Sequence, residues 1–529
     1  MAQQLEVPDL INPYGLSLSE PADHAFIEDL GLQLLLDQAP FNAPASRSLA
    51  LQALVELNCD QPTRRWRQEL FADLVGSQFL LEQLDRLASV LLRLHRQSNE
   101  FGWGSDLPTG LTMVRDFVRL VRNPPEFSSA RSAGLQALST YLAALAESEA
   151  LVEMEQFIQQ MADLGGLQLR VTVDEQGVPN EISTVQLYDR DSAEPPGFLT
   201  WGEEQSPQHR RQALRERGGL NHLGQLLQNF LSREYVAIVY RFNQLIGDLV
   251  SLMPAVDLYC AFASCFNSWR SRGIEICLPQ ILPAEQRLAE IEAARNPLIE
   301  KSRVDDQRQG AAPAIVANAI DRCSDANLMV LTGANNGGKT TYVKTAGLIQ
   351  LLGQKGWYVP ARSARFSEVD VIFTHFVAAD DIARGEGRYR NELRRMRTIL
   401  ERATPLSLVI LDEPCGGTDY HEGQRQSRIL LRAFHLLGAA TYFTTHMHEL
   451  TASLEGHEWS AVQRLQVATR LENGQLRYLY RVEPGIATHS YGEQIAQDLG
   501  LGEQEVLNVV RAQADQGGYL RLLRHGSDS

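Results

Sequence analysis

The sequence predicts a multidomain protein in which an all-α region, interrupted by a small β-containing insertion, is followed by an α/β domain. The 529 residues are enough for several domains. Through the first part, apolar residues recur at three- and four-residue spacing, which is typical of packed helices. Over residues 301–515, short apolar runs alternate with helical segments, which indicates a parallel sheet covered by helices.

Residues 1–22 are rich in Pro, Gly and Ser and are predicted to be an N-terminal arm. Residues 23–165 are predicted to be helical. Apolar side chains at helical spacing support this prediction: Leu32, Leu35, Leu36, Leu80, Leu81, Leu84, Leu87, Val90 and Leu91. Breaks are expected where Pro and Gly cluster, at residues 40–44, 102–104 and 123–125.

The β-containing insertion is predicted at residues 166–212. Leu167–Val173 alternates like a strand, 174–177 reads as its turn, and Val185–Tyr188 is the candidate partner strand. Helices are expected to return over residues 213–300, with a kink or break at Pro254. The α/β domain is placed at 301–515 and a short tail at 516–529.

The net charge of −16 is distributed unevenly along the chain. Residues 1–300 hold 23 basic and 39 acidic side chains, whereas residues 301–529 hold 26 of each kind. The whole acidic excess therefore belongs to the first part. A pI near 5.3 argues against a generally basic nucleic-acid coat.

Cysteine usage and hydropathy indicate a cytoplasmic protein. None of the six cysteines forms a C-x-x-C pair or a Cys/His cluster with zinc spacing, so reduced thiols are expected. The N-terminus lacks the basic and apolar regions of a signal peptide. No run approaches 18 uncharged apolar residues, and no membrane span is predicted.

The strongest motif follows the apolar run Leu328–Thr332. Here the chain satisfies G-x-x-x-x-G-K-[ST], a phosphate-binding loop between a strand and a helix. The loop comprises Gly333, Ala334, Asn335, Asn336, Gly337, Gly338, Lys339, Thr340 and Thr341. Its backbone N–H groups would surround the phosphates of ATP. Lys339 would reach the β- and γ-phosphates, and the Thr340 hydroxyl would ligate Mg²⁺.

Two further strand ends carry candidate catalytic residues. The apolar run 406–411 ends in Asp412, which is expected to hold Mg²⁺, and Glu413, which is expected to orient or deprotonate the attacking water. A third run, 439–444, leads to His446. A His at the carboxyl end of such a strand faces the ligand crevice and could contact the γ-phosphate or the water.

Taken together, these segments resemble the MutS family of ATPases, which are relatives of ABC-type ATPases. Residues 332–342 resemble the family's T-G-P-N-M-G-G-K-S-T-Y, residues 412–418 its D-E-x-x-x-G-T, and residues 445–450 its T-H-x-x-E-L. The resemblance is strong over about 295–515 and weaker over 25–295. It implies a helical core and lever, a clamp at the insertion, and a P-loop ABC-type ATPase domain ending in a dimerising helical element near Val506–Val510.

The resemblance also implies a homodimer that couples ATP hydrolysis to clamp movement on structured or duplex DNA. No mismatch-reading domain is expected, because the N-terminal arm is short and lacks the Phe-x-Glu signature. The acidic insertion and first part leave open a second interpretation, in which the ATPase regulates a protein or ribonucleoprotein partner. Two Arg-rich stretches, 64–67 and 210–217, are candidate phosphate contacts or ordinary helix-flanking charges.

Two positions depart from the family pattern. The trans-acting signature corresponds to residues 387–393, and its Ser is replaced here by Gly387. Arg388, or Arg384, is therefore a candidate for trans charge on the γ-phosphate, the alternative being a solvated basic helix. Where the family places an aromatic ring against adenine, the chain has Ile315, near Asn318. Because an aliphatic side chain stacks on a base more weakly than an aromatic ring, the sequence does not predict which nucleotide is selected.

Overall fold

The computed structural model shows two compact units, which are described separately. The first comprises residues 1–15, 41–49 and 69–263, and the second residues 16–40, 50–68 and 264–529. The residues that the structure describes are 6–13, 25–55, 59–100, 107–173, 179–189, 242, 244–299, 315–334, 336–376, 388–456, 459–472, 475–487, 500 and 502–517.

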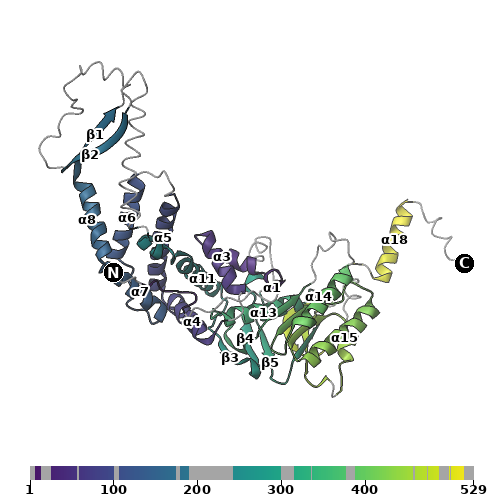
Figure 1. Ribbon diagram of the computed structural model, residues 1–529. Coiled ribbons are helices and arrows are strands. Elements are labelled where there is room, and N and C mark those ends of the chain that lie inside the picture. Colours follow the sequence, from purple (N-terminus) through teal and green to yellow (C-terminus); the bar gives the residue numbers. More distant parts are fainter. Residues whose placement is uncertain are drawn as a thin grey trace, which may run out of the picture. The chain divides into compact units, whose positions relative to one another are not determined.

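The first unit is built mainly of helices (Figure 1). They are the start of α3 (Pro44–Val55), the second half of α4 (Gln61–Gly76), α5 (Gln78–Glu100), α6 (Leu107–Arg122), α7 (Ala133–Ala146), α8 (Glu149–Asp163) and the start of α11 (Met253–Ser271). The leucine stripe of α5 is buried, as its spacing predicts. The buried carboxylate of Asp257 accepts hydrogen bonds from the backbone N–H groups of Asn42 and Ala43, just before α3.

The predicted breaks between helices agree with the structure where it describes them. Helix α2 (Leu32–Gln38), in the second unit, ends before residues 40–44, and α6 ends at Arg122 before 123–125. Helix α11 begins at Met253 after a turn, which confirms the break at Pro254. The break at 102–104 lies outside the described residues. The helical stretch Gln244–Ser271 is long and apolar enough to span a membrane. However, 83% of its apolar 18-residue window is buried inside the protein, as in a core helix.

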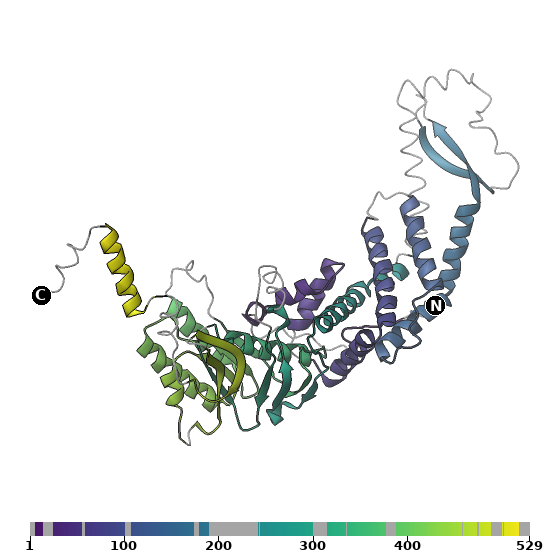
Figure 2. The same cartoon turned by 180° about the vertical axis from the view of Figure 1, so that it is seen from behind.

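Two long strands follow α8, as the alternation of residues 167–173 predicts. Strand β1 (Leu164–Val173) pairs antiparallel with β2 (Pro179–Asp189), and Figure 2 shows the two blue arrows side by side. The predicted partner strand is therefore confirmed and is longer than the sequence pattern suggested. The turn between the two strands and residues 190–241 lie outside the described residues.

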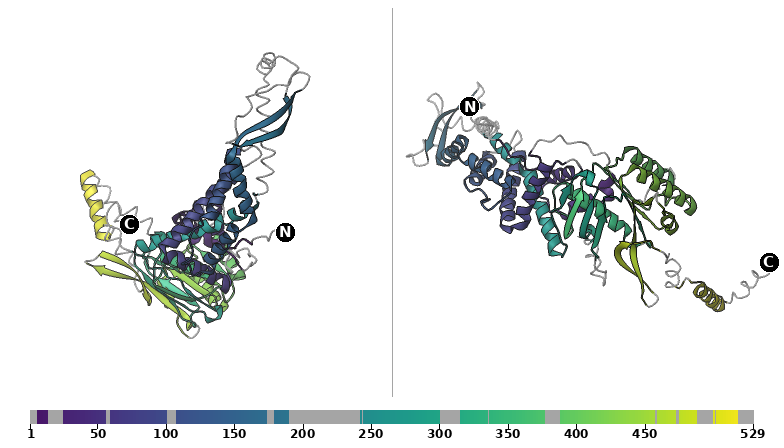
Figure 3. Two further views of the ribbon diagram at one scale, coloured as in Figure 1. Left: turned by 90° about the vertical axis from the view of Figure 1, so that its left-hand side faces the viewer. Right: turned by 90° about the horizontal axis from the view of Figure 1, so that it is seen from below.

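The second unit contains a six-stranded sheet of order β12-β11-β6-β10-β9-β8. Its strands are β6 (Leu328–Thr332), β8 (Ile372–His375), β9 (Leu408–Asp412), β10 (Ala440–Thr445), β11 (Val462–Glu472) and β12 (Gln475–Pro484). Neighbours pair in parallel except for β11 and β12, the long antiparallel hairpin visible in Figure 3. The predicted α/β domain with a mainly parallel sheet is thus present.

Helices cover both faces of this sheet. Side chains alternate along β9: Ile410 lies near Gly347 of α13 (Lys339–Gln354), whereas Val409 and Leu411 belong to the core beneath the other helices. Those helices are α14 (Arg388–Arg402), α15 (Tyr420–Leu437) and α16 (His448–Ala452). The short helix α1 (Ala25–Asp29) lies against β8.

The prediction of helices over residues 213–300 is wrong for residues 280–294. They form β3 (Gln280–Leu282) and β4 (Ala289–Ala294), joined by a 3-10 turn. With β5 (Asn318–Arg322) and β7 (Ser363–Ser367) they make a four-stranded sheet of order β3-β7-β4-β5. Buried and exposed residues alternate at the start of β4, a period of two that no helix shows. The strands of the second unit therefore begin before residue 301.

Candidate functional site

The phosphate-binding loop connects β6 to α13, as its motif predicts. Gly333 and Gly338 have φ angles of 150° and 101°, which residues with a Cβ atom rarely adopt. A Cβ on Gly333 would also lie 3.0 Å from the Cβ of Val467. Asn336 adopts a left-handed φ of 63°, and Asn335 lies outside the described residues. Glycine at these points lets the loop turn tightly into the N-terminus of α13.

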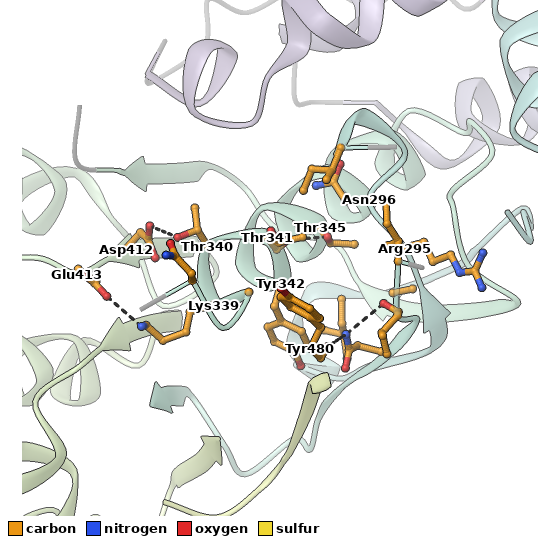
Figure 4. A pocket seen from close by; sticks show the side chains of 18 of the residues that line it. Arg295, Asn296, Lys339, Thr340, Thr341, Tyr342, Thr345, Asp412, Glu413 and Tyr480 are labelled. Atoms are coloured by element: carbon orange, nitrogen blue, oxygen red, sulfur yellow. Dashed lines mark hydrogen bonds and ion pairs between the residues drawn. The ribbon is translucent and has the colours of Figure 1, made fainter. Parts of the chain in front are cut away.

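Lys339 is buried at the first turn of α13. Its Nζ donates to the carbonyl oxygens of Gly333 and Ala334, at 3.0 and 3.2 Å, and lies 3.1 Å from Oε1 of Glu413. The amine thus sits between its own loop and the end of β9 (Figure 4). Phosphate oxygens could take the place of these oxygen partners, because all of them are acceptors for the same ammonium group.

Asp412 lies at the end of β9 and is held by two hydroxyl groups. Thr340 donates to its Oδ2 at 2.7 Å and Thr444 to its Oδ1 at 2.6 Å. Burial raises the pKa of Asp412, and the two hydroxyl donors counteract this effect. A carboxylate and a hydroxyl this close offer the hard oxygen ligands that Mg²⁺ prefers, so both residues fit the predicted metal site. Within the described chain, no cluster of three or more His, Cys, Asp or Glu could hold a metal.

Glu413 is strained and strongly acidic. Its φ of 50° is left-handed, and its N–H donates to Oγ1 of Thr444 at 3.0 Å. Nδ1 of His446 lies 3.5 Å from Oε2 of Glu413. Interaction with His446, and then with Lys339, lowers the pKa of Glu413 to about 2 even though burial opposes the shift. The carboxylate is therefore ionised at neutral pH and can accept a proton or a hydrogen bond from water.

These residues line one cavity of about 730 Å³. We call Lys339, Thr340, Asp412, Glu413 and His446 the polar end. The distal end is formed by Ile315, Asn318 and Tyr480. Residues 338–342, at the N-terminus of α13, also line the cavity. The structure therefore brings together residues that the sequence placed on separate strands and loops.

Asn318 does not present a free amide to the cavity. Its Nδ2 donates to the carbonyl oxygen of Tyr480 at 3.0 Å, and its Oδ1 accepts from the N–H of Val482 at 2.7 Å. These two bonds join β5 to β12. They flank Tyr480, whose φ of 53° is left-handed, so Asn318 holds this tyrosine in an unfavourable backbone conformation.

Several residues that line the cavity were not predicted as site residues, among them two tyrosines and two polar residues. Tyr480 comes from β12, Tyr342 from α13, and Arg295 and Asn296 follow β4. Figure 4 shows Arg295 and Asn296 far from Asp412 and Glu413. A period-two pattern over 289–294 was the one available signal for the strand before Arg295. No local pattern marks Tyr480, because only the pairing of β12 with β11 and the side-chain hydrogen bonds of Asn318 on β5 bring it to the site.

The trans-acting signature is described only in part. Gly387 and Arg384 lie outside the described residues, and Arg388 is the first residue of α14. Further along α14, Arg397 pairs with Glu401, and Arg395 donates to the carbonyl oxygen of Thr374. Part of the basic stretch thus has structural partners.

Glu392, also on α14, links the signature segment to the loop after β9. Its buried carboxylate accepts a hydrogen bond from the N–H of Gly417 at 3.3 Å. Gly417 lies four residues after Glu413 in the same loop. The signature helix is therefore in direct contact with the segment that carries the acidic residue of the polar end.

The arginines near residue 65 serve mainly a structural role. Arg64 and Arg67 are buried, and Arg64 forms an ion pair of 2.8 Å with Glu368. They do not form an open phosphate-binding surface. The second stretch, 210–217, lies outside the described residues.

Comparison with known proteins agrees with this geometry. Residues 329–516 match the model of MutS domain V. The chain is 32% identical over 265 residues to the DNA mismatch repair protein MutS of Streptococcus sanguinis, a match that covers 50% of this chain and 29% of that protein. The MutS protein of Myxococcus xanthus is 37% identical over 278 residues, a match that covers 50% of this chain and 30% of that protein. The MutS protein of Ruegeria pomeroyi is 38% identical over 255 residues, which covers 47% of this chain and 27% of that protein.

The chain thus spans less than a third of the length of these curated relatives. The matched residues include the phosphate-binding loop, Asp412, Glu413 and His446, which the fold brings into one cavity. Over about half of its length the chain is therefore similar to MutS proteins, and the similarity includes the residues of this cavity.

Proposed function

We propose that the chain is an ATPase that converts ATP and water to ADP and phosphate. One observation carries the proposal: a single cavity is lined by Lys339, Thr340, Asp412, Glu413 and His446. Together these side chains supply the cation, the metal ligands and the carboxylate that phosphoryl transfer needs. The ammonium group, the metal-ligand pair and the ionised carboxylate are each held by contacts of 2.6–3.5 Å. No second catalytic arrangement competes with this one among the described residues.

Each residue of the polar end has a proposed role. Lys339 exchanges the carbonyls of its loop and Glu413 for phosphate oxygens, which frees the carboxylate of Glu413. Glu413 then orients the attacking water and accepts its proton, and His446 positions Glu413. Thr340 and Asp412 hold Mg²⁺. When bound, the metal neutralises phosphate charge.

The distal end is proposed to receive the base. Tyr480 offers an aromatic face and Ile315 an apolar one, so the base would be stacked on one side only. Asn318 acts indirectly by holding Tyr480. Gly387 and Arg388 are proposed to act on the ATP of a second copy in a homodimer.

A Glu413→Gln variant tests the proposed reaction. The amide cannot accept the proton of water, so we expect kcat to fall about 10²–10⁴-fold while ATP binding is retained. Phosphate release and nucleotide binding are measured on the same sample. Glu422→Gln, the same change at an exposed position on α15, is the control and should behave like the wild type. Equal kcat in Glu413→Gln and wild type would contradict the assignment.

We further propose that ATP binding and hydrolysis move a clamp on DNA, as the similarity to MutS proteins suggests. The relatives are DNA mismatch repair proteins, and DNA is therefore the first partner to test. Anisotropy with duplex, branched and single-stranded DNA over a salt series gives the answer. Tight, salt-dependent binding supports a DNA clamp. Sedimentation with and without ATP checks the homodimer, since a strict monomer in both conditions contradicts it.

A protein or ribonucleoprotein partner is the second candidate, and a specific observation favours it. Residues 1–300 carry the entire acidic excess, and buried Arg64 and Arg67 add no phosphate-binding surface. An acidic surface repels the DNA backbone and suits a basic partner. Absence of DNA binding at low salt, combined with intact ATPase activity, would favour this candidate over the DNA clamp.

A further inference from the structure

Helix α15 has two apolar faces, although only one of them is needed for folding. The inner face consists of Gly423, Ser427, Leu430, Leu431 and Phe434, all buried. Leu430, Leu431 and Phe434 belong to the hydrophobic core under the six-stranded sheet. A surface helix with this core contact is expected to be polar on its opposite face.

The outer face of α15 departs from that expectation. Ile429 is 51% exposed and Leu436 is 76% exposed. With Arg425 and Arg432 these two residues follow a spacing of four, three and four. This is the a/d spacing of a helix that packs along a second helix, with apolar residues at a and arginines at d. We call Arg425, Ile429, Arg432 and Leu436 the outer seam.

The arginines of the outer seam have no acidic partner of their own. Arg425, Arg432 and the neighbouring Arg428 are exposed, and in the described part of the chain none of them forms an ion pair or hydrogen bond. Glu422, one turn before Arg425, does not pair with it. With the neighbouring Arg428, the outer seam thus presents three unneutralised charges around two large apolar side chains.

We propose that the outer seam is a docking site for an acidic amphipathic helix of a partner protein. Acidic side chains opposite Arg425 and Arg432 would neutralise their charges. Apolar side chains would cover Ile429 and Leu436, whose exposure is otherwise unfavourable. A DNA backbone would satisfy the arginines but would leave Leu436 exposed, so the seam fits a helix better. This proposal is independent of the proposed ATPase reaction.

Two labelled helical peptides of about three heptads each test the site by fluorescence anisotropy on the full chain. One has Leu at a and Glu at d, and the other has Lys at d. We expect the Glu peptide to bind at least about tenfold more tightly than the Lys peptide, because each d position changes from attraction to repulsion. The double variant Arg425→Glu/Arg432→Glu should reverse this preference, and Leu436→Asp should weaken both complexes.

The control is Arg86→Glu/Arg93→Glu, which changes the charge equally at exposed positions with the same seven-residue spacing on α5. It should leave the preference for the Glu peptide intact. Equal affinity for both peptides, or a preference that survives Arg425→Glu/Arg432→Glu, overturns the proposal. Loss of duplex DNA binding in that variant, with no peptide binding by the wild type, would show that the face contacts nucleic acid instead.

Discussion

The polar end and the distal end of the cavity are built in different ways. At the polar end, each charged group is already held by a partner from another element, as Asp412 is by Thr340 and Thr444. At the distal end, Ile315 offers an apolar side chain and Tyr480 an aromatic ring, and Asn318 hydrogen-bonds to the backbone of Tyr480 and Val482. We therefore expect the chemical step to depend on the first region and nucleotide affinity on the second.

After Glu413→Gln, the largest effect is expected from Asp412→Asn at the polar end. The amide removes the negative charge and offers only one acceptor to the two hydroxyl donors, so Mg²⁺ binding should weaken and kcat should fall about 100-fold. Steady-state hydrolysis is measured over a Mg²⁺ series. Asp419→Asn is the control, because Asn is also a good N-cap and Asp419 caps α15 through His421 and Glu422. If both variants lost activity equally, folding and not metal binding would be the cause.

His446→Ala separates the electrostatics of the polar end from simple packing. His446 is the first cause of the lowered pKa of Glu413, about 2, so its removal should raise that pKa. Since Glu413 acts when ionised, activity lost on acidification should then be lost at higher pH than in the wild type. Because the pKa of an unperturbed Glu lies at about 4.3, the profile of kcat/KM between about pH 3 and about pH 6 reports this shift. A profile that matches that of the control His421→Ala would exclude this role for His446.

Tyr480→Ala addresses the distal end. Loss of the ring should raise KM for ATP about tenfold and leave kcat within about twofold, because stacking acts on the bound base and not on the phosphates. Tyr480→Phe should keep most of the affinity. Tyr478→Ala is the control, since its ring lies 6.1 Å from that of Tyr480 but does not line the cavity. A fall in kcat at unchanged KM would place Tyr480 in the chemistry and break the contrast between the two ends.

The smallest effect is expected from Ile315→Phe. An aromatic ring here would give the base a second stacking face and should tighten ATP binding about threefold. Competition between ATP and GTP shows whether selectivity changes as well. Unchanged affinity for both nucleotides would mean that residue 315 does not face the base.

The α15 helix adds a comparison on a smaller scale. Its inner face is explained by the core, and its outer seam is not. Both faces have helical spacing, so the sequence alone cannot say which one is buried. Only the position of the helix on the sheet makes Leu436 exposed and Phe434 buried.

Sequence patterns predicted the polar end well because its residues follow strands directly. Lys339 and Thr340 lie a few residues after β6, Asp412 ends β9, and His446 follows β10. Parallel neighbouring strands bring their carboxyl ends to one edge of the sheet, so short-range motifs become one site without further information. The helical stripe of α5 was predictable for the same reason, since burial there depends on a local period.

Only the tertiary structure decided the distal end and the four-stranded sheet. Strands β3 and β4 depend on pairing with β7 and β5, which are distant in the sequence, and the helical prediction for 280–294 failed for this reason. Tyr480 reaches the cavity through the β11–β12 hairpin and is held there by Asn318, 162 residues earlier. Local motifs determine which groups can do chemistry, whereas non-local strand pairing determines what surrounds them.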